Sequence, residues 1–268
     1  MLKYPCLVLD HDDTVVQSEA TINYPFFCYI LDQFRPGETI TQEEYTAGCF
    51  SPGFADMCRQ RYHFTEQELD DEFRGWLEYV KTHIPDPFPG IRRLILRYKE
   101  AGGIICVVSH SSAMNITRDY QTHFGIVPDA IYGWDFPEHQ RKPSTYPLEQ
   151  IMRKYNLRPD ELLMVDDMKP AWVMCHNAGV PIAFAAWSKE NCPAILEEMI
   201  GLCDYTFHSP AELEAWYQAV DRLHPEMIMI YVIDRKTPVE TLQKISPEEM
   251  QKIATPLREK GYNISVSC

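Results

Sequence analysis

The sequence contains no long hydrophobic run, no paired-cysteine motif and comparatively little positive charge. None of its apolar stretches approaches the roughly 20 residues that a membrane-spanning helix needs. The nine cysteines form no C-x-x-C pair and no His/Cys cluster at zinc spacing, which argues against a zinc site. Because no signal-peptide pattern is present either, we expect a cytoplasmic protein with reduced cysteines.

The shortage of basic residues sets the overall charge. The 268 residues carry a formal net charge of −14 at pH 7, which argues against nucleic acid and against an anionic membrane surface as partners. A small anionic ligand stays compatible with this charge, because one lysine or one helix N-terminus can reverse the field locally. The length and the 45% hydrophobic content fit one core domain with smaller additions.

One short stretch near the start places carboxylates directly after an apolar run. Residues 6–9 are apolar and predict a buried strand of a parallel sheet. Asp10, Asp12 and Thr14 then follow at its carboxyl end, where open α/β sheets bind ligands. Taken alone, these acids would also suit a turn or a helix cap.

The chain from residue 90 onward alternates between helical and strand-like patterns. Apolar runs predict strands at 104–108, 130–132, 162–165 and 182–185, with helices between them. Such a series predicts the α/β class, with a doubly wound, right-handed parallel sheet. We therefore assign residues 1–17 and 85–222 to one core domain.

Two further segments flank or interrupt this core. Residues 18–84 read as an all-helical insert, with capping-box patterns at Thr41 and Thr65 and three prolines at its end. Residues 223–268 predict a βαβ-like extension, with strands at 227–233 and 262–266 and helices within 238–259. The extension could lengthen the sheet or pair with another subunit to form a homo-oligomer.

Polar side chains follow three of the predicted strands: Asp10 with Asp12, Ser109, and Asp166 with Asp167. Lys142 lies at a helix start between the last two strands. If these strands are neighbours, their side chains meet in one crevice. A carboxylate can attack phosphorus, a hydroxyl and an ammonium can hold phosphate oxygens, and acidic oxygens can hold Mg²⁺. The set predicts phosphoryl transfer on a small phosphorylated metabolite.

With these motifs in order, the sequence resembles the haloacid dehalogenase superfamily of phosphatases. The matching segments are Asp10-His11-Asp12-Asp13-Thr14, Val107-Val108-Ser109-His110-Ser111, Lys142-Pro143 and Val165-Asp166-Asp167. The helical insert lies where the branch containing phosphoglycolate phosphatase and β-phosphoglucomutase has its cap domain. The resemblance implies a Rossmann-like core, a cap that closes over the site, and Mg²⁺ as cofactor.

The resemblance also implies roles for single residues. Asp10 would be the nucleophile and a metal ligand, and Asp12 the general acid/base, with its backbone carbonyl on the metal. We expect crowding against Asp10 and Asp167 to raise the pKa of Asp12. Further expected residues are the metal ligands Asp167 and Asp166, the phosphate contacts Ser109, Lys142, Thr14 and His110, and the cap-loop contacts Phe50 and Ser51 from the loop 48–53.

Several alternatives stay open at this point. Ser109 could simply cap the next helix, and Asp166 could be a turn residue. The presence of an acid at Asp12 favours hydrolysis of phosphate monoesters, but a phosphomutase would need the same residues. Asp13 replaces the usual glycine of the family and Ala171 replaces a frequent second acid, so a member that binds a phosphorylated ligand without turnover is a third hypothesis.

Overall fold

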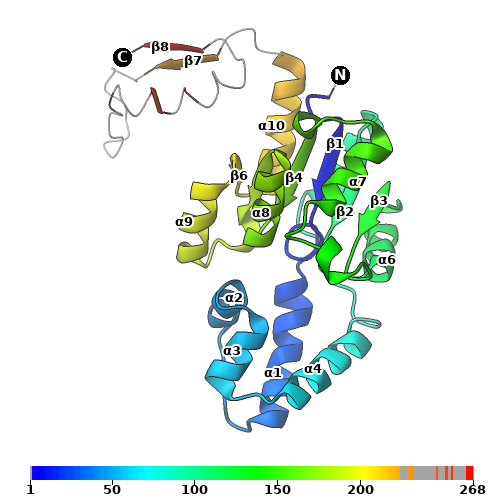
Figure 1. Cartoon of the computed structure of the whole chain (residues 1–268), viewed down its shortest axis with the longest axis vertical. Coiled ribbons are helices and arrows are strands. Elements are labelled where there is room, and N and C mark those ends of the chain that lie inside the picture. Colours follow the sequence, from blue (N-terminus) through cyan, green and yellow to red (C-terminus); the bar gives the residue numbers. More distant parts are fainter. Residues whose placement is uncertain are drawn as a thin grey trace. The chain divides into compact units, whose positions relative to one another are not determined.

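Six parallel strands form the central sheet of the chain, which is described here by a computed structural model (Figure 1). The structure describes residues 2–223, 228–231, 246, 251–252, 255 and 264–267. It divides into two units, Met1–Tyr217 and Gln218–Cys268, and the sheet belongs to the first. The strands are β1 (Cys6–Leu9), β2 (Ile104–Val108), β3 (Ala130–Tyr132), β4 (Leu162–Asp166), β5 (Ile182–Ala185) and β6 (Tyr205–Phe207).

The strand order, β3-β2-β1-β4-β5-β6, places β1 between the two strands with which it shares the candidate site. Leu9 of β1 is level with Val107 of β2 and with Val165 of β4. The polar residues that follow each strand therefore emerge at the same edge, as the parallel sheet predicted from the sequence requires. Strand β6 was not predicted, because three residues between two helices are too few to show a hydrophobic pattern typical of a strand.

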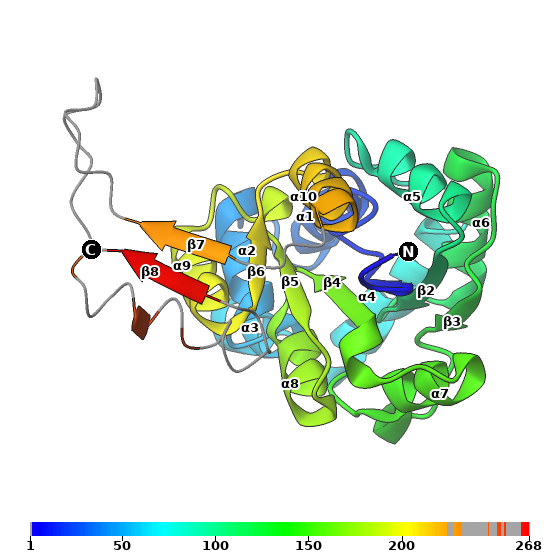
Figure 2. The same ribbon diagram turned by 90° about the horizontal axis from the view of Figure 1, so that it is seen from above.

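Helices cover both faces of this sheet (Figure 2). One face packs in a single apolar cluster with α5 (Ile91–Glu100), α6 (Ala113–Phe124) and α10 (Pro210–Leu223). The other face packs with α7 (Tyr146–Tyr155) and α8 (Lys169–Ala178). Neighbouring residues of β1 alternate between the clusters: Leu7 and Leu9 lie in the first, Cys6 and Val8 in the second. Burial on both faces explains why each strand reads as a continuous apolar run.

The insert between β1 and α5 is helical, as expected, and is called the cap from here on. A π-helical turn over Glu19–Asn23 leads into the cap helices α1 (Tyr24–Phe34), α2 (Gln42–Phe50), α3 (Phe54–Tyr62) and α4 (Glu66–Tyr79). Both expected capping boxes are present, at Thr41 with Glu44 and at Thr65 with Glu68. The cap has its own apolar cluster, centred on the fully buried Phe27.

The loop expected over residues 48–53 is shorter than predicted. Helix α2 continues through Phe50, so that only residues 51–53 connect it to α3. The reason lies at Gly48, which packs directly against the side chain of Met57 in α3, where a Cβ atom would clash. This glycine allows two helices to approach closely and does not end the first one.

The second unit contains a parallel pair of strands, β7 (Ile228–Tyr231) and β8 (Ile264–Ser267). Both overlap the strands expected in the C-terminal extension. The helices expected within 238–259 lie almost entirely outside the described residues. No helix among the described residues is long and apolar enough to cross a membrane.

Candidate active site

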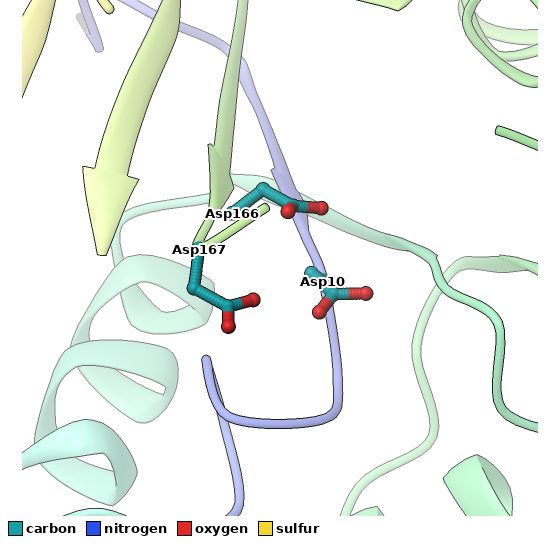
Figure 3. Close-up of side chains that lie close together, drawn as sticks. All are labelled: Asp10, Asp166 and Asp167. Carbon is teal, nitrogen blue, oxygen red and sulfur yellow. The ribbon is translucent and has the colours of Figure 1, made fainter. Parts of the chain in front are cut away.

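Three carboxylates converge where β1 and β4 end (Figure 3). Asp10 follows β1, Asp166 is the last residue of β4 and Asp167 follows it. Oxygen atoms from all three lie within 4.8 Å of one another, and each residue is at most 4% exposed. The structure thus brings together the acids whose convergence the sequence predicted.

Lys142 lies between two of these acids. Its Nζ atom donates to Asp10 Oδ1 at 2.8 Å and to Asp166 Oδ2 at 2.6 Å. Burial alone would lower the pKa of Lys142, but the adjacent Asp10 and Asp166 carboxylates outweigh this effect and raise it. Lys142 is therefore a permanent positive charge beside the oxygen atoms of Asp10.

Asp12 has the raised pKa that a general acid requires. Loss of hydration is the largest cause, and the negative charge of Asp10 adds to it, while His11 acts in the opposite direction. The cause differs in part from our expectation, since Asp167 does not contribute to the shift. The Asp167 carboxylate is instead neutralised by a lysine at 2.9 Å, described below.

Asp10, Asp12, Asp167, Ser109 and Lys142 open onto one cavity of about 160 Å³. Its lining residues are Asp10, Asp12, Asp13, Glu19, Ser109, His110, Lys142, Asp167, Met168, Pro170 and Lys189. Ser109 is buried, and its Oγ atom accepts a hydrogen bond from the backbone N–H of Ser111. His110 donates from Nε2 to the Lys142 carbonyl at 3.1 Å, which positions the ring at the cavity wall.

Three expected substrate contacts lie elsewhere. Thr14 is fully buried and is not among the residues that line the cavity; its hydroxyl donates to Asp167 Oδ1 at 3.4 Å. Phe50 packs against the apolar cluster around Phe184 of β5. Neither Phe50 nor Ser51 lines this cavity. They also do not line a second cavity of about 300 Å³, which residues of the cap and of the core enclose. The loop is shorter than predicted because α2 extends through Phe50.

Lys189 lies in the site but was not among the residues predicted from the sequence. It is 2% exposed, and its Nζ atom lies 2.9 Å from Asp167, 3.3 Å from Asp13 and 3.4 Å from Glu19. The available signal was its position shortly after β5, at the same edge of the sheet. Trp187, two residues earlier, also reaches the site by donating to the Thr14 carbonyl at 3.2 Å.

Lys189 also explains the unusual Asp13. The backbone of Asp13 has a φ of +54°, the left-handed region that glycine adopts easily and aspartate tolerates. Its Oδ1 atom accepts from the backbone N–H of Glu19 at 3.0 Å, and its Oδ2 atom faces Lys189. The additional carboxylate next to the site thus pairs with a lysine that it shares with Asp167 and Glu19.

The acid cluster suits a hard divalent cation. Two ammonium groups, those of Lys142 and Lys189, line the cavity together with five carboxylates, those of Asp10, Asp12, Asp13, Glu19 and Asp167. A sixth carboxylate, that of Asp166, lies beside Asp10 and Asp167. This donor set of oxygen atoms and excess negative charge is what Mg²⁺ prefers. Ala171, which replaces a frequent acid of the resembled family, is buried in the apolar cluster on α8 and supplies no ligand.

Replacement of Lys189 by methionine is expected to destabilise the protein strongly. The change leaves the buried Asp13 and Asp167 and the partly buried Glu19 without their common counter-ion, which costs about 3–5 kcal/mol in the free energy of unfolding. Denaturant unfolding with a chelator present measures the loss. The double variant Asp13→Gly/Lys189→Met should recover part of it, because one of the unpaired charges is then removed.

The matched control is Lys169→Met, since Lys169 is half-exposed and pairs with Glu198 on the surface. We expect its effect to stay below about 1 kcal/mol. Equal losses for the two lysine variants, or no recovery in the double variant, would show that the buried network does not hold the site together.

Comparison with known proteins gives the family. The model of the family described as haloacid dehalogenase-like hydrolase matches residues 7–185, well over half of the chain. A phosphoglycolate phosphatase of Vibrio vulnificus is 28% identical over 116 residues, which are 42% of this chain and 48% of that protein. The chain therefore spans about half the length of the curated relatives that it matches.

Solved structures agree on the fold. A predicted phosphoglycolate phosphatase from Haemophilus somnus superimposes with a TM-score of 0.62 at 18% identity, over 81% of this chain and 99% of that one. CbbY from Rhodobacter sphaeroides, solved in complex with xylulose-(1,5)bisphosphate, gives 0.59 at 17% identity, over 80% and 96%. Together with the matched motifs, the family comparison shows that the chain belongs to the haloacid dehalogenase-like hydrolases.

Proposed function

We propose that the protein is a Mg²⁺-dependent phosphatase that hydrolyses a small phosphate monoester through an aspartyl-phosphate on Asp10. The observation that carries this proposal is the single cavity onto which Asp10, Asp12, Ser109 and Lys142 all open. It joins a nucleophile, an acid/base, and a hydroxyl and an ammonium for phosphate oxygens. The curated relatives, which are named phosphoglycolate phosphatases, support a phosphate ester as substrate.

In the first step, a carboxylate oxygen of Asp10 attacks phosphorus and the ester P–O bond breaks. Lys142 holds Oδ1 of Asp10, which leaves Oδ2 available for attack. The negative phosphate approaches a negative carboxylate, so Lys142 is needed to reduce the repulsion at close range. Ser109 and His110 line the same cavity and would hold the other phosphate oxygens.

Asp12 moves the protons. Its raised pKa favours the protonated form, which donates to the leaving alcohol as the ester bond breaks. The resulting carboxylate then takes a proton from water, and the water oxygen attacks the phosphorus of the aspartyl-phosphate. The P–O bond to Asp10 breaks, phosphate leaves, and Asp12 is again protonated.

In this proposal, Asp10 and Asp167 would hold Mg²⁺, with Asp166 behind them. Asp166 does not line the cavity, and its oxygens accept hydrogen bonds from the Met168 N–H at 2.8 Å and from Lys142. Its better role is to position Lys142, and Thr14 similarly steadies Asp167. Bound Mg²⁺ would neutralise charge on the phosphate and on the acid cluster.

Chelation of the metal is expected to reduce the rate of phosphate release from a generic aryl phosphate by about 100-fold or more, because the acid cluster then repels the substrate. Saturating Mg²⁺, at 100 times its dissociation constant, should also stabilise the fold by about 2.7 kcal/mol. Phosphate release and thermal unfolding with and without Mg²⁺ test both effects. Full activity in the presence of a chelator would remove the metal from the proposal.

A cytoplasmic location also fits. The eight cysteines in the described part of the chain are all free, as expected in a reducing compartment. The proposed partner is a small phosphorylated metabolite, neither nucleic acid nor a membrane.

A further inference from the structure

A second and larger cavity lies beside the proposed catalytic one. Its volume is about 300 Å³, and His110 lines both cavities. The cap supplies Asn23, Tyr45, Phe54, Leu69, Glu72, Phe73, Trp76 and Leu77, and the core supplies His110, Ser112, Asn115 and Trp134. A phosphate ester with its phosphorus at Asp10 would therefore place its leaving group in this cavity. The inference below rests on the proposed function.

Glu72 is the unusual residue of this cavity. It is only 7% exposed, and its carboxylate makes no hydrogen bond or ion pair with any residue that the structure describes. Leaving a buried charge without a partner is costly, and burial accordingly raises the pKa of Glu72 to about 7. Glu72 therefore lowers the stability of the empty protein, and a ligand in the cavity could supply the partner that its carboxylate lacks.

The sequence of α4 shows how Glu72 comes to face inward. Leu69 and Trp76 lie three residues before and four residues after it, and both pack against the apolar cluster of the cap. At this spacing, Glu72 lies on the same face of the helix as these two apolar side chains. The helix thus carries a carboxylate where its pattern calls for an apolar residue.

Aromatic rings line the same cavity as this carboxylate. Tyr45 and Phe54 form one pair, with ring centroids 6.3 Å apart, and Phe73 and Trp76 form another at 6.1 Å. The described residues that line the cavity include no lysine and no arginine. Trp134 is excluded from this group, because Arg141 already stacks on its ring at 3.9 Å.

We propose that this cavity recognises a positively charged nitrogen, so that the substrate is a phosphate ester of an amino alcohol or of a quaternary-ammonium alcohol. A cation neutralises Glu72 and is attracted to the faces of the aromatic rings. The phosphate of the same molecule would lie near Lys142. An anionic leaving group, such as glycolate, would meet a carboxylate with no cation to hold it.

Three esters of graded charge test this inference. They are phosphocholine, its neutral isostere with a tert-butyl group in place of the trimethylammonium group, and phosphoglycolate. We expect kcat/KM to be roughly 10- to 100-fold higher for phosphocholine than for the neutral isostere, and lowest for phosphoglycolate. A ratio of one or less between the first two esters would overturn the inference.

The variant that isolates the charge is Glu72→Gln, which keeps the shape of the side chain and removes an unpaired buried carboxylate. In this variant, the preference for phosphocholine over its neutral isostere should disappear. The control is Glu78→Gln on the same helix, where the glutamate is exposed and pairs with Lys81. A preference that survives Glu72→Gln, or that falls equally in both variants, contradicts the assignment.

Binding separates this inference from the proposed function. Choline, without phosphate, should raise the unfolding temperature of the wild-type protein more than its neutral isostere does, and Glu72→Gln should abolish the difference. If aryl phosphate is not hydrolysed while choline still binds through Glu72, the proposed function fails and the cavity assignment holds. If aryl phosphate is hydrolysed and choline does not bind, the assignment fails alone.

Discussion

Replacement of Asp10 by asparagine is expected to reduce phosphate release by about 10⁴- to 10⁶-fold, the range found when a nucleophile is removed. The amide is a poor nucleophile, so the aspartyl-phosphate cannot form. The amide also places no negative charge beside Lys142, which keeps Asp166 as a partner at 2.6 Å. The variant should therefore fold. Initial rates with an aryl phosphate and saturating Mg²⁺ measure the loss.

The control for this variant is Asp160→Asn, which changes an exposed aspartate that pairs with Arg158 on the surface. We expect its rate to equal that of the wild-type protein. Circular dichroism and thermal unfolding should show that the Asp10→Asn variant keeps its fold. A folded Asp10→Asn variant that retains more than a few per cent of the rate would rule out Asp10 as the nucleophile.

Replacement of Asp12 by asparagine should reduce turnover by about 10²- to 10⁴-fold, the usual contribution of a general acid/base. Its effect should depend on the leaving group. An aryl alcohol with a low pKa leaves without a proton, so that Asp10 is still phosphorylated, but hydrolysis of the aspartyl-phosphate then lacks its base. We expect a rapid burst of about one equivalent of aryl alcohol, followed by slow turnover, in a stopped-flow experiment.

With an alkyl phosphate the same variant should show no burst, because the first step now lacks its acid. Serine or alanine at position 12 should behave in the same way as asparagine. A steady rate without a burst on the aryl ester, together with an unchanged rate on the alkyl ester, would show that Asp12 does not move protons.

Much of the fold and the acid cluster could be predicted because both depend on local sequence. Strands β1, β2 and β4 are buried on both faces, so each reads as an apolar run that ends at its first polar residue. Parallel strands end at one common edge of the sheet. The proximity of Asp10, Ser109 and Asp167 could therefore be predicted without knowledge of the contacts between them.

The residues that were missed owe their roles to distant contacts. Lys189 reads as an ordinary surface lysine, and only the fold surrounds it with Asp13, Glu19 and Asp167. Its position after β5 was nevertheless a usable signal. Glu72 lies in a helix rich in acids, so its sequence context favours the solvated face, whereas its spacing from Leu69 places it inside.

The cap was the hardest part to predict in detail. Its four helices are short, and the connection between α2 and α3 depends on Gly48, which can act either as a helix breaker or as a site of close packing. Only the contact with Met57 decides between these roles. As a result, the expected contacts Phe50 and Ser51 do not line the larger cavity, whereas Tyr45 and Phe54 do.

The cap and the core are also linked through the proposed site. Glu19, at the start of the cap, faces Lys189 and accepts a hydrogen bond from Thr46 of α2. A continuous polar path thus runs from Asp167 through Lys189 and Glu19 to the cap.

The most direct test of the central claim is mass spectrometry of the Asp12→Asn variant, quenched in acid during the burst with an aryl phosphate. Our account predicts the added mass of one phosphoryl group on the peptide that contains Asp10, and no such addition when Asp10 is also replaced by asparagine. A phosphoryl group on a different residue, or a burst of aryl alcohol from protein that carries none, would contradict it.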